Sequence, residues 1–96
     1  MNAEELTLNI AVNLGRLSRW GIEGKYSRIR QFIAETETYL QQLDDAPKND
    51  RFLKTYQRFR GEFVNTIKLK SDSPDEAWAE AALTWANILQ HRAKLA

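Results

Sequence analysis

The segment from Tyr26 to Leu43 constrains the fold most strongly, because its regularly spaced positions advance by alternate steps of three and four residues. These positions are Tyr26, Ile29, Ile33, Thr36, Leu40 and Leu43. The spacing places one side chain per turn on a single helix face, and it matches the a and d positions through which one helix packs along another. The segment therefore predicts a helix within an all-α protein.

Three other segments carry apolar residues at helical spacing. Their members are Leu6, Ile10, Leu14, Leu17 and Trp20; Phe52, Tyr56, Phe59, Phe63 and Ile67; and Trp78, Ala81, Ala82, Trp85, Ile88 and Leu89. Glycine, proline and short polar residues separate the segments at 21–24, 44–50 and 71–74. We therefore predict helices at about residues 3–20, 25–43, 50–69 and 74–94. No run alternates with a period of two over the length of a strand, so no sheet is expected.

The residues at the predicted helix ends give more local expectations. Ser73 is the expected N-cap of the last helix, with Pro74 at the first helical position and Glu76 closing a capping box. Asn49 or Asp50 can cap the third helix. The glycines at 21 and 24 are expected in the turn between the first two helices.

The short connections predict the arrangement of the helices. Consecutive helices joined by short loops lie side by side and antiparallel, which gives an up-down-up-down four-helix bundle. A chain of 96 residues can build one such core, so we expect a single domain over 1–96. Asn13, Thr36 and Thr84 fall near mid-height and are expected to share a buried polar layer.

The composition limits the classes of function. Fourteen basic and thirteen acidic residues give a net charge of +1, so there is no overall field to attract nucleic acid or an anionic membrane. No apolar stretch approaches the roughly 20 residues that span a bilayer, and the start of the chain does not resemble a secretory signal. Without cysteine, disulfides and thiolate sites are excluded. We expect a cytoplasmic protein that makes no membrane contact.

Nothing in the sequence predicts catalysis. His91 is the single histidine, and Ile88 stands three residues before it, so the Glu-x-x-His spacing of carboxylate-bridged metal bundles is absent. The usual zinc ligand sets and Cys-His pairs are excluded by composition, although counting residues leaves a Ser-His-Asp triad open. Adjacent carboxylates along a helix point apart, and the glycines lack phosphate-loop spacing. We expect no enzyme activity, no metal and no cofactor.

Some apolar residues lie outside the core stripes and suggest a protein partner. On the first helix, Leu8 and Val12 project nearly opposite to the main apolar face. On the last helix, Leu83 does the same, and it is flanked by Ala79 and Ala86. Because these two helices are neighbours in the expected topology, the five residues predict an exposed apolar strip. The candidate partner is a second copy of the chain in a two-fold homodimer, or another protein.

A basic cluster supplies the alternative function. The cluster consists of Arg16, Arg19, Lys25, Arg28 and Arg30 near the end of the first helix and the start of the second. It could bind nucleic acid or another anion in a salt-dependent way. The plainer interpretation is that the cluster is neutralised within the fold by nearby acids, namely Glu23, Asp72, Asp75, Glu76 and Glu80. A third interpretation places an apolar ligand cavity beside Trp78 and Trp85, unless a facing phenylalanine fills it.

Overall fold

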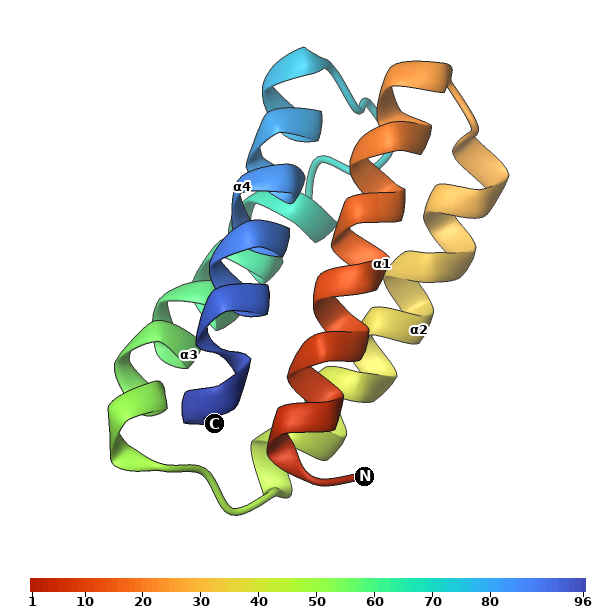
Figure 1. The fold of residues 1–96 in the computed structure, drawn as a ribbon. Helices are drawn as coiled ribbons and strands as arrows, with labels where there is room; N and C mark the ends of the chain where they lie inside the picture. The colour runs from red at the N-terminus through yellow and green to blue at the C-terminus, as the bar shows by residue number, and fades with distance from the viewer.

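The computed structural model describes residues 1–96 and consists of helices without any strand (Figure 1). The α-helices are α1 (Ala3–Glu23), α2 (Tyr26–Asp45), α3 (Asp50–Glu62) and α4 (Glu76–Arg92). A π-helix, η1 (Phe63–Lys68), continues α3, and a 3-10 turn, η2 (Ala93–Leu95), follows α4. The four helices pack into a body of 36 × 20 × 19 Å. The predicted all-α fold of four packed helices is confirmed.

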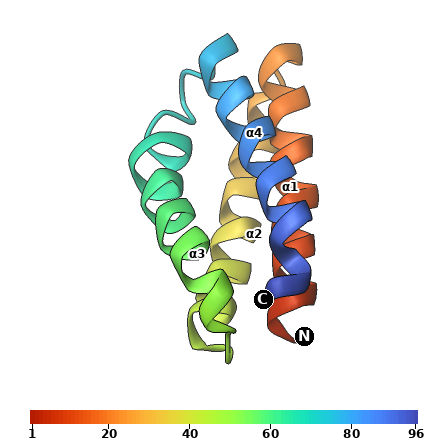
Figure 2. The same cartoon turned by 60° about the vertical axis from the view of Figure 1, so that its left-hand side comes forward.

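Helix α1 lies between α2 and α4 and contacts both along its length (Figure 1). Figure 2 shows α3 on the side of the molecule away from α1, and both views place the two chain termini at the same end of the molecule. The turn between α1 and α2 and the loop before α4 lie at the other end. None of the helices is both long enough and apolar enough to cross a membrane.

One cluster of twenty buried residues forms the core, and it draws on the apolar stripes of all four helices. The largest fully buried side chains include Phe52, Phe59 and Phe63, which project inward from α3 and η1. Tyr26 was expected in this core, and that prediction is wrong, because 54% of the residue is exposed. It is the first residue of α2 and therefore stands at the end of the bundle, where no further helical turn covers it.

The third predicted helix, at 50–69, is not one continuous α-helix. The α-helical part ends at Glu62, and the chain continues in π geometry from Phe63 to Lys68. Within this π segment Ile67 is fully buried, and its carbonyl oxygen accepts a hydrogen bond of 2.9 Å from Nε1 of Trp78. A tertiary contact to α4 therefore accompanies the change from α to π geometry.

The expected N-cap of α4 is corrected by two residues, from Ser73 to Asp75. Helix α4 begins at Glu76, and Oδ1 of Asp75 accepts a hydrogen bond of 2.8 Å from the backbone N–H of Trp78. Ser73 and Pro74 precede the helix, so the predicted capping box does not form. A carboxylate is a stronger acceptor than a hydroxyl and is favoured by the positive end of the helix dipole. The predicted cap of α3 is confirmed for Asn49, which accepts from the N–H of Arg51 at 3.3 Å.

The two glycines expected in the first turn have different roles. Gly24 ends α1 with a left-handed φ of 71°, a conformation that favours glycine. Gly21 lies inside α1 and not in the turn. A Cβ at position 21 would stand 2.9 Å from a ring carbon of Trp78, so glycine here permits close packing between α1 and α4.

The buried polar residues are all hydrogen-bonded. Nδ2 of Asn13 donates to Oγ1 of Thr36 at 3.3 Å between α1 and α2. Thr84 is exposed and takes no part, because it lies on the outer side of α4. Instead, Oγ of Ser18 donates to the carbonyl oxygen of Ala79 at 2.7 Å and links α1 to α4. The predicted polar layer therefore exists as a pair between two helices.

Candidate protein-interaction surface between α1 and α4

The outer sides of α1 and α4 meet in a shallow groove of about 270 Å³. We call it the α1–α4 groove, and it is lined by Leu8, Ala11, Val12, Gly15, Leu83, Ala86, Asn87 and Gln90. Its largest apolar side chains stand well out of the core: Leu8 is 40% exposed, Val12 is 52% exposed and Leu83 is 48% exposed. The residues chosen from the sequence on two separate helices therefore border one groove.

The floor of the groove consists of small residues. Ala11 and Ala86 are buried where the two helices approach each other, and Gly15 is half-buried beside them. Small side chains allow two helices to approach closely, so α1 and α4 form a tight pair while their larger side chains stand at the borders of the groove. Ala79 was also expected on the strip, but only 2% of it is exposed and its carbonyl accepts from Ser18. It belongs to the contact between the helices.

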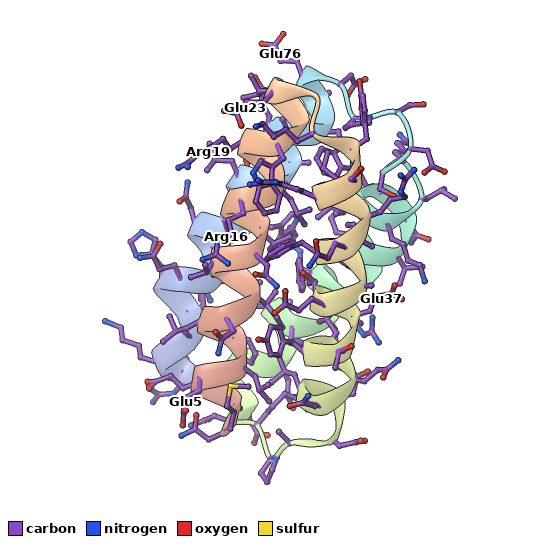
Figure 3. The ribbon with its side chains drawn as sticks, turned by 90° about the vertical axis from the view of Figure 1, so that its right-hand side faces the viewer. Glu5, Arg16, Arg19, Glu23, Glu37 and Glu76 are labelled. Atoms are coloured by element: carbon purple, nitrogen blue, oxygen red, sulfur yellow. The ribbon has the colours of Figure 1, made fainter.

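Charged residues flank the groove at both ends. Helix α1 begins with the exposed Glu4 and Glu5 and carries Arg19 near its other end, as Figure 3 shows for Glu5 and Arg19. Helix α4 begins with Glu76, and the exposed Lys94 lies in η2, two residues after its end. The ion pairs of the structure lie elsewhere, between Arg60 and Asp44 at 2.9 Å and between Lys68 and Glu37 at 2.6 Å. The charges beside the groove have no ionic partner within the chain.

The five residues of the basic cluster are exposed but do not line one pocket. The guanidinium of Arg16 lies 5.8 Å from the ring centre of Phe32, and that of Arg28 lies 5.8 Å from the ring of Trp20. Lys25 and Arg28 line one shallow hollow at the start of α2, whereas Arg30 lines another beside Tyr26, Ser71 and Asp72. Arg19 lines neither hollow. No ion pair joins the cluster to the acids expected to neutralise it.

The two tryptophans of α4 do not share a cavity. Trp78 is 2% exposed and its indole N–H donates to Ile67. The ring of Phe59 packs against Trp85 with 5.5 Å between ring centres, so a facing phenylalanine occupies the space where an apolar ligand was considered. The hollow that remains beside Trp85 opens between α3 and α4 and is lined mainly by polar residues.

A polar cluster that the sequence did not predict joins α2 to α3. Oη of Tyr56 donates to Oδ1 of Asp44 and, at 3.3 Å, to the carbonyl oxygen of Leu40. Arg60 donates through Nε at 3.3 Å and through Nη2 at 2.9 Å to the two oxygens of the same carboxylate. Lys48 lies 5.2 Å from the ring of Tyr56, and its Nζ donates to three carbonyl oxygens at the end of α2.

The electrostatics of this cluster favour a neutral phenol beside an ionised carboxylate. Burial raises the pKa of Tyr56, and the hydrogen bond to the Asp44 carboxylate raises it further. Burial also opposes ionisation of Asp44, but hydrogen bonds from Arg60 and Tyr56 outweigh that effect and lower the pKa of Asp44. From the sequence, Asp44 had been assigned to a loop and Tyr56 to the core. Asp44 lies on α2, whereas Tyr56 and Arg60 lie on α3, so no local spacing in the sequence indicates this pairing.

The structure contains no group of three or more histidine, aspartate or glutamate side chains that could hold a metal ion. No protein-family model, curated protein or solved structure matches the chain.

Proposed function

We propose that this protein is a small, non-catalytic helical interaction module that associates with a second copy of itself through the α1–α4 groove. The observation that carries the proposal is the set of three exposed apolar side chains, Leu8, Val12 and Leu83, that border one groove with a floor of small residues. Single surface leucines are ordinary, but a contiguous apolar surface on a small protein is typical of an interaction site.

The shape of the surface supports a second copy of the same chain as the partner. Two-fold symmetry places the same patch on both copies, so a patch must contain both the projecting and the receiving element. Here Leu8 and Val12 project from α1, and Gly15 and Ala86 leave space between the helices. The leucine and valine of one copy can therefore enter the groove of the other by packing of ridges into grooves.

The size of the molecule sets how much of this side a dimer must use. One long side measures 36 by 20 Å, and a standard protein interface buries about 800 Å² on each partner. A specific dimer would therefore need contact over nearly the whole of this side. A partner that covered only the groove would bury less and bind weakly.

The charges at the two ends of the groove also favour a second copy of the chain as the partner. Helix α1 begins with Glu4 and Glu5 and carries Arg19 one turn before its end at Glu23. Helix α4 begins with Glu76, and Lys94 lies in η2 just after its end. A two-fold operation can therefore place Arg19 opposite acids of the second copy. Such pairs would orient the dimer more than stabilise it, because an exposed ion pair contributes only about 0 to 1 kcal/mol.

We infer that α1 and α4 run antiparallel, within an up-down-up-down bundle. Ser18, near the end of α1, bonds to Ala79, near the start of α4, and Leu8 lines the groove together with Gln90, near the end of α4. This direction sets the charge pattern of the surface, because it places the acidic start of α1 beside Lys94 and the start of α4 beside an end of α1 that carries both Arg19 and Glu23.

The test is sedimentation equilibrium of the wild-type chain and of a Leu8→Asp, Leu83→Asp double variant. We expect the wild type to have twice the mass of one chain and the double variant to have the mass of one chain, with equal helical circular dichroism. Two carboxylates in an apolar contact would lose their hydration without gaining partners, which prevents association.

Leu69→Asp is the matched control, because Leu69 is a 72% exposed leucine outside the groove. This variant should remain dimeric. A monomeric wild type, or a double variant that stays dimeric, would refute self-association through the groove.

The alternative is an accessory binder of nucleic acid or another anion. The observation in its favour is that α2 begins at Tyr26 without a capping side chain or an acidic residue in its first turn, while Lys25 and Arg28 flank this end. An uncapped helix N-terminus with cations beside it favours an anion. Titration of a labelled oligonucleotide at two salt concentrations tests it: binding should weaken steeply as salt rises, and no binding at low salt removes it.

A further inference from the structure

A second hollow, of about 320 Å³, lies between α3 and α4 and is separate from the basic cluster. Its base is made by the half-buried Thr55, Trp85 and Ile88, and its rim includes the exposed Arg58, His91 and Arg92. No pattern in the sequence links His91 to Trp85. The fold brings them together with two arginines from different helices.

The hollow is a cationic site without a compensating acid. None of the residues that line it is acidic, and neither Arg58 nor Arg92 takes part in an ion pair. Glu62, one turn further along α3 from Arg58, accepts a hydrogen bond of 3.4 Å from Oγ1 of Thr66. The guanidinium of Arg92 is oriented across the hollow, because its Nη1 donates to Oγ1 of Thr55 at 3.4 Å. Guanidinium groups of this kind bind carboxylate or phosphate through paired N–H donors.

The base of the hollow adds an apolar and aromatic surface. Trp85 is held from behind by Phe59, with 5.5 Å between ring centres, so its indole is fixed in place while part of it faces the hollow. Ile88 supplies an aliphatic neighbour. Ligand sites commonly combine an apolar wall with a few convergent polar groups, and a volume near the lower end of the usual range suits a ligand with one ring.

We propose that this hollow binds a small ligand in which a carboxylate or phosphate is joined to a single aromatic ring. The anionic group contacts Arg58 and Arg92, and the ring lies against Trp85 and Ile88. The hollow shares one lining residue, Asn87, with the α1–α4 groove and otherwise lies between α3 and α4, so binding of the aryl anion and dimerisation can be measured separately.

The test is titration of the full-length protein with phenyl phosphate and with benzoate, monitored by backbone and indole N–H chemical shifts. Inorganic phosphate and phenol serve as the charge-only and ring-only probes. We expect at least one of the two aryl anions to bind about tenfold or more tightly than either partial probe, and to shift the signals of Trp85 and Arg92. Comparable binding of inorganic phosphate would overturn the proposal, as would shifts confined to other parts of the chain or the absence of binding at millimolar concentration.

The variants Arg58→Gln and Arg92→Gln test the two cations. Each should weaken binding of the aryl anion by about tenfold, because a hydrogen bond to a charged group is lost. Arg51→Gln is the matched control, since Arg51 is an exposed arginine of α3 outside the hollow. An equal loss in Arg51→Gln would show that only diffuse charge attracts the anion, and would refute the site. If a variant fails to fold, the location of the shifts in the wild type still decides the outcome.

Discussion

Oη of Tyr56 on α3 donates a hydrogen bond to Oδ1 of Asp44 at the C-terminal end of α2. Arg60, one turn further along α3, donates to the same carboxylate. The two helices are thus joined by one carboxylate that receives donors from two successive turns. Because Asp44 is still partly open to solvent, water can replace some of these bonds when a donor is removed.

The variant Tyr56→Phe should lower the free energy of unfolding by about 1 to 2 kcal/mol. A hydrogen bond to a charged acceptor contributes about 1.5 to 3 kcal/mol, and the exposure of Asp44 reduces the loss. Urea denaturation measures the change. Tyr39→Phe is the control, because Tyr39 bonds to Glu35 of its own helix at 3.2 Å and does not join two helices. Equal losses in the two variants would show that the link between α2 and α3 stabilises the fold no more than a bond within one helix.

The stability difference between wild type and Tyr56→Phe should depend on pH at both extremes. The pKa of Asp44 is lowered by folding, so its contribution is present above about pH 4 and is lost as the pH falls. The pKa of Tyr56 is raised by folding, so its contribution is present below about pH 10 and is lost as the pH rises further. Denaturation curves from pH 2 to pH 11 should show a plateau between these limits. A constant difference at all pH values would contradict the assignment.

The variant Gly21→Ala should destabilise the protein by about 1 to 2 kcal/mol. Its Cβ would stand within 3.0 Å of two ring carbons of the buried Trp78, so α1 or the indole must move. The matched control is Gly61→Ala on α3, where a Cβ meets no atom within 4 Å. That variant should stabilise by about 0.5 to 1 kcal/mol, because alanine is the better helix former. Thermal melting distinguishes the two; a stabilised Gly21→Ala would refute the close packing of α1 on α4.

The variants Asp75→Ala and Ser73→Ala should differ in stability. Asp75 caps α4, so its removal should cost about 1 kcal/mol, as is usual for the loss of an N-cap. Ser73 precedes the helix and makes no capping bond, so its removal should cost less than about 0.5 kcal/mol. Chemical denaturation of both variants measures the difference. The opposite order would restore the cap that the sequence suggested.

Helical periodicity was sufficient to predict the existence and approximate limits of the helices. Apolar residues at steps of three and four can bury one face only in helices that pack together, and this is a property of local spacing. The cap of α4 was misplaced because Ser73 and Asp75 are both good N-cap residues, and the sequence does not show where the backbone first becomes helical. The π-helix was missed because Phe63 and Ile67 also fit α-helical spacing, and the bond between the Ile67 carbonyl and Trp78 joins residues that are not neighbours in the sequence.

The candidate site was predicted in part. Leu8, Val12 and Leu83 could be assigned to outer faces because they lie away from the main apolar stripe of their own helix. The burial of Ala79 could not be predicted from the sequence, because it depends on how closely α1 approaches α4 at Ser18 and Gly21. The hollow beside Trp85 was not anticipated either, since Arg58 and Arg92 are 34 residues apart in the sequence and meet only across two helices.

The sequence by itself determined that the chain forms helices and which side of each helix is apolar, because both follow from the spacing of residues along one segment. Tertiary structure decided which helices touch, where glycine must allow close contact, which donors reach Asp44 and which cations face the same hollow. These features depend on distances between residues far apart in the chain, and such distances are fixed only when the helices pack.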